Sequence, residues 1–188
     1  MDEKPTWHVE FHLEWSFHAT RLPEFWSEEC PEGQDITFRF LSLLGRHGVK
    51  AHFYVLGHVA EYHPKLIETI EKIGHPIGSH GYWHRHNEWE GDASDQLART
   101  HLPAACQGYR SPFWDTTPRP GLAGGFFFRV LPYKIILQEI RKTGIMYLHP
   151  HDLYHQSRGP LRRRVGQRHV WDKLDRILTE ASVRNSSR

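Results

Sequence analysis

Two kinds of apolar segment alternate along this chain, and this alternation is the feature that most limits how the chain can fold. Short runs with a period of two, or with continuous apolar character, are each followed by a segment with apolar residues at helical spacing. The expected strands cover residues 7–17, 49–57, 76–80, 106–112 and 145–150, and the expected helices cover residues 36–48, 63–74, 92–102, 132–144 and 170–182. This order predicts an α/β fold with a largely parallel sheet.

Helix-terminating residues support these boundaries. Asp35 is expected to cap the first helix, which ends at Gly48. Pro64 lies near the start of the second helix and Gly74 at its end, in the positions that proline and glycine prefer. Gly144 closes the helix that precedes the last expected strand.

Length and composition limit the class of protein. A chain of 188 residues is expected to form a single domain, residues 1–188. The net charge of +2 gives no global field that would attract nucleic acid, and the local basic run at residues 159–169 is interpreted as a solvated loop. Aromatic residues make up 13% of the chain. They would suit a sugar-binding groove, but packing in the core is the favoured interpretation.

The expected location is the cytoplasm. Cys30 and Cys106 form no C-x-x-C motif and are expected to be reduced thiols. The first residues lack the basic and apolar regions of a signal peptide, and no apolar run approaches the length of a membrane span. The sequence does not indicate an oligomeric state.

Polar residues capable of chemistry gather where the expected strands end. Ligands in α/β folds bind at the carboxyl ends of the strands. His80 and His84 follow one strand, while Arg110 and His149 lie at the ends of two others. The first strand carries a row of polar side chains on one face, which comprises His8, Glu10, His12, Glu14 and Ser16.

His80 and His84 are four residues apart, and they could share a metal ion if the intervening residues turn helically. Neutral imidazoles suit zinc and related divalent ions. In a chain with 16 histidines the spacing alone is weak, and chance remains an alternative. His75 and His86 are interpreted as surface residues.

Arg110 and His149 have functional and structural interpretations. A guanidinium after a strand could hold a carboxylate or a substrate oxygen, or it could be a surface arginine. An imidazole at a strand end could act as a general acid, or it could be bonded to backbone. These residues alone do not decide between the alternatives.

Taken together, three segments resemble the polysaccharide deacetylases, carbohydrate esterase family four. They are GSHGYWH, GYRSPFW and YLHPHDL, at residues 78–84, 108–114 and 147–153, and they occur in the family's order. Residues 43–57 and 126–144 are also similar to the branch of this family found beside exopolysaccharide and exosortase loci. The resemblance covers most of the chain.

The resemblance implies a distorted (β/α) barrel that hydrolyses N-acetyl groups on an amino-sugar glycan. A divalent metal, most simply zinc, would polarise the acetamide and activate water. By motif position, His80 and His84 would bind the metal. Arg110 would orient the catalytic base, and His149 would act as the acid.

The first motif departs from the family pattern. His12 stands where the family has its base Asp, Glu14 keeps an acidic residue, and Trp15 replaces a second Asp. Glu14 is therefore the candidate third metal ligand. His12 could be a substitute base or a fourth ligand, and Glu10 is a fallback acid on the same strand face.

The chain is also shorter than the family pattern. Residues 115–129 bridge a region where relatives carry further strand and helix, so the barrel is expected to be incomplete on one side. Phe126, Phe127 and Phe128 could cover the gap or belong to the core. Three functions follow as hypotheses: an active deacetylase with an altered base, a degenerate member that binds metal or glycan, and another amide hydrolase on the same barrel.

Overall fold

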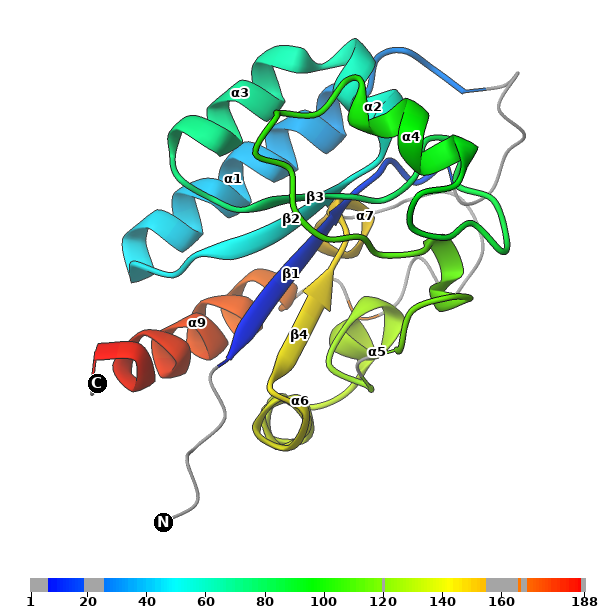
Figure 1. Ribbon diagram of the computed structural model, residues 1–188. Helices are drawn as coiled ribbons and strands as arrows, with labels where there is room; N and C mark the ends of the chain where they lie inside the picture. The colour runs from blue at the N-terminus through cyan, green and yellow to red at the C-terminus, as the bar shows by residue number, and fades with distance from the viewer. Residues whose placement is uncertain (1–6, 19–25, 120, 155–165, 167–168, 187–188) are drawn as a thin grey trace.

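The computed structural model describes residues 7–18, 26–119, 121–154, 166 and 169–186. Four parallel strands form one sheet in the order β3-β2-β1-β4 (Figure 1). The strands are β1 (His8–Leu13), β2 (Ala51–Val55), β3 (Ile77–Ser79) and β4 (Ile145–Leu148). The expected α/β fold with a parallel sheet is confirmed.

The helices fall into two groups by position. Long helices surround the sheet, and shorter ones gather at the end toward which the strands point (Figure 1). The long helices are α1 (Pro31–His47), α3 (Pro64–Lys72), α6 (Tyr133–Thr143) and α9 (Val170–Ser186). The shorter helices are α2 (Gly57–Tyr62), α4 (Ala93–Arg99), α5 (Gly125–Val130) and α7 (Pro150–Leu153).

Local sequence explains where α1 and α4 start and stop. α1 begins with Pro31 at its first position, so the prediction that Asp35 caps this helix is wrong. Gly48 ends α1 in the left-handed conformation, as predicted. Asp92 caps α4 by accepting a hydrogen bond of 2.8 Å from the backbone N–H of Asp95.

Packing explains why β1 lies at the centre. Its apolar face holds Phe11, which stacks on Phe40 at 4.4 Å between ring centroids and contacts Phe53. All three rings are fully buried. The polar row on the other face is also buried, because Glu10, His12 and Glu14 are each less than 5% exposed. Burying these ionisable groups is unfavourable unless they find partners, which makes this face the candidate functional site.

The expected strand at residues 106–112 does not form. The chain makes one isolated bridge, from Ser79 to Tyr109, and a second bridge joins Gly124 to Tyr147 at the other edge of the sheet. Gly108, with φ of +78°, and Pro112 both oppose an extended ladder here. Among the described residues the parallel ladder therefore comprises four strands with a single bridge at each edge, which is consistent with the distorted and incomplete (β/α) barrel that was expected.

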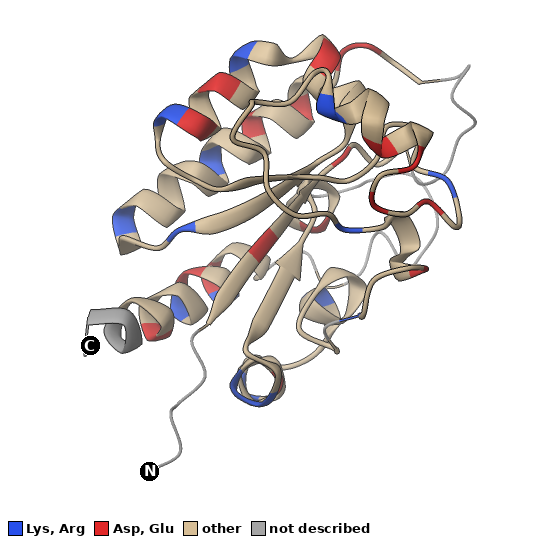
Figure 2. Ribbon diagram, viewed as in Figure 1, with Lys and Arg blue, Asp and Glu red and all other residues tan. Residues whose placement is uncertain are grey.

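The cysteines, the possible membrane span and the basic run can also be compared with the structure. Cys30 and Cys106 are free thiols. No helix among the described residues is long and apolar enough to cross a membrane. Basic and acidic residues are interspersed along α3 and α9 in the view of Figure 2. Most of the basic run at residues 159–169 lies outside the described residues.

Candidate active site

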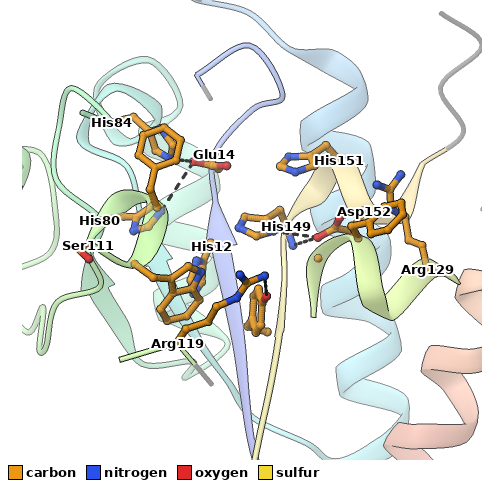
Figure 3. Close-up of a pocket in the computed structure, with 15 residues that line it drawn as sticks. His12, Glu14, His80, His84, Ser111, Arg119, Arg129, His149, His151 and Asp152 are labelled. Atoms are coloured by element: carbon orange, nitrogen blue, oxygen red, sulfur yellow. Dashed lines mark hydrogen bonds and ion pairs between the residues drawn. The ribbon is translucent and has the colours of Figure 1, made fainter. Parts of the chain in front are cut away.

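Glu14, His80 and His84 converge at the carboxyl end of the sheet (Figure 3). One ligand atom from each lies within 4.8 Å of the others. His84 Nε2 contacts Glu14 Oε2 directly, and His80 Nε2 lies 3.8 Å from the same oxygen. All three side chains are buried. The predicted convergence of these residues is therefore present.

The backbone achieves this convergence without the helical turn expected between the two histidines. His80 follows β3 directly, and Gly81 then turns the chain with φ of +70°. His84 itself has φ of +50°, which is unfavourable for a residue with a side chain. Glu14 comes one residue after β1, where its N–H donates to the carbonyl of His12 at 3.0 Å.

The protonation states at this cluster suit a bound cation. His80 Nδ1 pairs with the carbonyl of Arg110 at 2.7 Å, which leaves Nε2 as the ligand atom facing Glu14. Burial holds the pKa of His80 well below its usual value, so this imidazole is neutral. Burial opposes ionisation of Glu14, but His84 and neighbouring histidines lower its pKa well below the usual range. Two imidazoles and a carboxylate are a ligand set that zinc accepts.

His12 lies beside this cluster, and its ring centroid is 4.9 Å from that of His80 and 5.0 Å from that of His149. Burial lowers the pKa of His12 to about 4, so the ring is neutral at pH 7. Its Nε2 lies 3.5 Å from Glu10 Oε2, which is beyond a hydrogen bond. His12 is absent from the group of atoms that could share one ion with Glu14.

Arg110 does not orient His12 directly. Its guanidinium pairs with both carboxylate oxygens of Glu10, and the Nε–Oε2 distance is 2.9 Å. Burial would raise the pKa of Glu10, but contacts with His12 and Arg110 lower it to about 2. The fallback acid of the sequence analysis is therefore an ionised carboxylate between the arginine and the imidazole.

His149 faces the cluster from the end of β4 (Figure 3). Its Nδ1 lies 2.9 Å from Asp152 Oδ2, and its backbone N–H donates to the same oxygen at 3.0 Å. Burial would lower the pKa of His149, but the hydrogen bond to Asp152 outweighs burial and raises it. Arg129 lies 3.6 Å from the other oxygen of Asp152. The arrangement holds a proton on an imidazole that faces the pocket.

A pocket of about 340 Å³ contains the cluster, His12 and His149. Phe113, Trp114 and Phe126 form apolar parts of its wall. Phe113 and Trp114 are consecutive left-handed residues, with φ of +57° and +64°. Strained backbone of this kind gathers at functional sites. Phe128, by contrast, is fully buried in the core, so the core alternative holds for this residue, while Phe126 is exposed and lines the pocket.

His75 and His86, both predicted to lie at the surface, differ in exposure. His75 is buried, and its Nδ1 accepts from the backbone N–H of Ala51 at 3.2 Å, so the prediction of a surface position is wrong. His86 is exposed, as predicted, and pairs with Asp115. Asp152 was missed by the sequence analysis, although its spacing of three from His149 was a usable signal.

Sequence comparisons find similarity to one family over part of the chain. The sequence model described as polysaccharide deacetylase matches residues 27–103, a region that includes His80 and His84. The peptidoglycan-N-acetylglucosamine deacetylase of Bacillus cereus is 42% identical over 55 residues. That match covers 28% of this chain, which spans 20% of the length of this curated relative.

Solved structures share the fold. One match is a family 4 carbohydrate esterase pseudoenzyme from Bacillus anthracis, in a mutant form with restored enzymatic activity. It has a TM-score of 0.62 and 15% sequence identity to this chain. That alignment covers 98% of this chain and 65% of the other. The family 4 carbohydrate esterase of Streptomyces lividans, in complex with acetate, has a TM-score of 0.57 and 11% identity, with 97% and 88% covered. The match over residues 27–103 thus makes this part of the chain similar to the polysaccharide deacetylases, and the solved structures show a shared fold.

Proposed function

We propose that this chain, as a relative of the polysaccharide deacetylases, removes N-acetyl groups from an amino-sugar glycan with the help of a divalent metal. The observation that carries the proposal is the convergence of Glu14, His80 and His84 beside a second histidine that is hydrogen-bonded to a carboxylate. Zinc is the metal we propose, because two imidazoles and one carboxylate are ligands that suit it. The exopolysaccharide or exosortase branch and a cytoplasmic location remain predictions.

The residues have distinct roles in this proposal. Glu14, His80 and His84 would hold the metal, which when bound would polarise the acetamide carbonyl and activate water. His149 carries the proton that the leaving amine needs, and Asp152 fixes the ring so that its other nitrogen faces the pocket. Phe113 and Trp114 restrict where a sugar ring can lie.

His12 is the proposed base, although its environment is not that of a carboxylate. Burial keeps the ring neutral at pH 7, so its lone pair is available for a proton, although a pKa of about 4 makes the ring a weak base. Glu10 stands 3.5 Å away and is ionised, so it would stabilise the imidazolium that results. Arg110 acts on this pair through its two contacts with Glu10.

A second candidate function is a degenerate deacetylase that binds metal or glycan with little or no turnover. The observation that favours it is the replacement of the expected Asp by His12. Loss of a general base typically costs about 10² to 10⁴ in rate. Pseudoenzymes with this fold are compatible with such a protein.

One experiment separates the two candidates. The purified chain is loaded with zinc, its metal content is measured, and acetate release from N-acetylglucosamine oligomers is followed. We expect His80→Ala to lose both metal and activity, because one of three ligands is removed. His86→Ala is the matched control, since this exposed histidine of the same loop pairs with Asp115 and is not a member of the cluster, so metal content should be unchanged. Bound metal without acetate release would favour the binding protein.

A further inference from the structure

A second group of potential metal ligands lies in the same pocket as the first cluster. It consists of His149, His151 and Asp152, and one ligand atom from each lies within 4.8 Å of the others (Figure 3). The imidazole rings of His149 and His151 stack, with an angle of 15° between their planes and 4.8 Å between their centroids. Two imidazoles and one carboxylate repeat the ligand types of the first cluster.

The two oxygens of Asp152 have different partners. Oδ1 lies 3.6 Å from Nε of Arg129, whereas Oδ2 lies 2.9 Å from Nδ1 of His149. A proton joins Oδ2 to Nδ1, and a divalent ion can take its place, because both atoms have a lone pair to offer once the proton leaves. Since Arg129 contacts the other oxygen, the carboxylate can bind a metal without leaving its arginine.

Competition makes this second group the weaker of the two. A metal here must displace the proton between His149 and Asp152, and it must share the carboxylate with Arg129. Glu14 of the first cluster instead contacts the two histidines that would bind the metal with it. The two groups should therefore fill in order as zinc is added, and one equivalent of zinc should occupy the first cluster.

A metal in the second group would change what His149 can donate. A neutral ring that binds a metal through Nδ1 carries its remaining proton on the other nitrogen, which faces the pocket. Loss of that proton would leave an imidazolate instead of a neutral ring, so the metal-bound ring is a far weaker acid than an imidazolium. The leaving amine of the proposed reaction would then receive no proton from His149.

We propose that His149, His151 and Asp152 form a second divalent-metal site, and that a metal bound there inhibits the protein. The site stands on the ligand geometry, whereas the inhibition rests on the proposed function, because it acts through the general acid. Excess zinc would thus stop the reaction that the first zinc ion supports. His151 is the residue to change, since His149 and Asp152 also serve the reaction.

Zinc titration of the metal-free full chain tests the site. Binding is followed by calorimetry for the wild type, for His151→Ala, and for His169→Ala as the control. His169 also lies three residues from an aspartate, but this pair is more than 80% exposed. We expect the wild type and the control to bind two zinc ions. In His151→Ala the second ion should bind at least about 10- to 100-fold more weakly, since losing even an outer partner of a ligand has this effect.

Acetate release from N-acetylglucosamine oligomers is measured at the same zinc concentrations. Each protein is compared with its own rate at one equivalent of zinc. As the second ion binds, the rate of the wild type and of the control should fall by about 10² or more, the usual contribution of a general acid. The rate of His151→Ala should persist at the zinc concentration that inhibits the wild type.

The possible failures can be told apart. A single zinc ion per wild-type chain, or a second ion that binds His151→Ala as tightly as the wild type, would overturn the site. A second ion that depends on His151 but leaves the rate unchanged would overturn the inhibition. If the second ion depends on His151 and the chain releases no acetate at any zinc concentration, the site is supported, while the proposed function and the inhibition that rests on it are rejected.

Discussion

Replacing Asp152 by Asn should destabilise the protein and change its pH dependence together. Asp152 is buried, and contacts with His149, His151 and Arg129 lower its pKa from 3.8 to about 2 against the effect of burial. This difference corresponds to about 2 kcal/mol of folding free energy. Because the folded-state pKa is depressed, the contribution is complete above pH 3.8 and is lost as the pH falls toward 2. At pH 7 the variant should lose this folding free energy, and its melting temperature should fall by about 4 to 8 °C.

The effect on catalysis has a definite direction. The hydrogen bond to Asp152 raises the pKa of His149, and without this partner burial would lower it. As a general acid, His149 is active only while protonated, so activity falls as the pH rises through its pKa. We therefore expect the alkaline limb of the kcat profile to move to lower pH in Asp152→Asn.

Asp172 provides a matched control with the same spacing from a histidine. His169 and Asp172 are also three residues apart, at 3.7 Å, but both side chains are more than 80% exposed. Asp172→Asn should change stability by less than about 0.5 kcal/mol, as is usual for an exposed pair. Thermal unfolding and acetate release are measured from pH 5 to 9 on both variants. An alkaline limb that stays in place in Asp152→Asn would refute the role assigned to the His149–Asp152 pair.

Three further predictions concern the base, its support and the core. His12→Asp should raise kcat for acetate release by about tenfold or more if the missing carboxylate base limits the rate, whereas no gain over His12→Asn would contradict this. Glu10→Gln should lower the free energy of unfolding in urea at pH 7 by about 3 kcal/mol, because His12 and Arg110 hold the pKa of Glu10 near 2. A loss below about 1 kcal/mol would argue against that pairing. Phe128→Ala should lower the free energy of unfolding in urea by about 3 to 5 kcal/mol, since the ring is fully buried. Phe126→Ala, which removes an exposed ring, should lower it far less.

Segments with strong periodicity could be predicted from the sequence. The apolar spacing of residues 63–74 and 132–144 gave α3 and α6, and glycine marked the ends of α1 and α6. The short helices α2, α5 and α7 were not expected, because four to six residues carry too little periodic signal. The start of α1 was wrong because Pro31 at the first position outweighed the capping tendency of Asp35.

Most residues of the candidate site could be predicted from the sequence, but the side-chain contacts between them could not. Alternation along β1 placed Glu10, His12 and Glu14 on one face, and all three are buried there. The sequence could not reveal that Arg110 pairs with Glu10, because that contact joins residues 100 positions apart. Asp152 was missed although its spacing of three from His149 was a signal, because the burial that makes this pair important depends on the tertiary fold.

The back-to-back left-handed residues Phe113 and Trp114 have a consequence for engineering this protein. Glycine would relax the backbone at either position, and each strained residue costs on the order of 1 to 2 kcal/mol. A library screened for heat resistance alone should therefore enrich glycine at 113 and 114. The same clones would lose the two rings that line the pocket, so thermal selection here would trade ligand affinity for robustness.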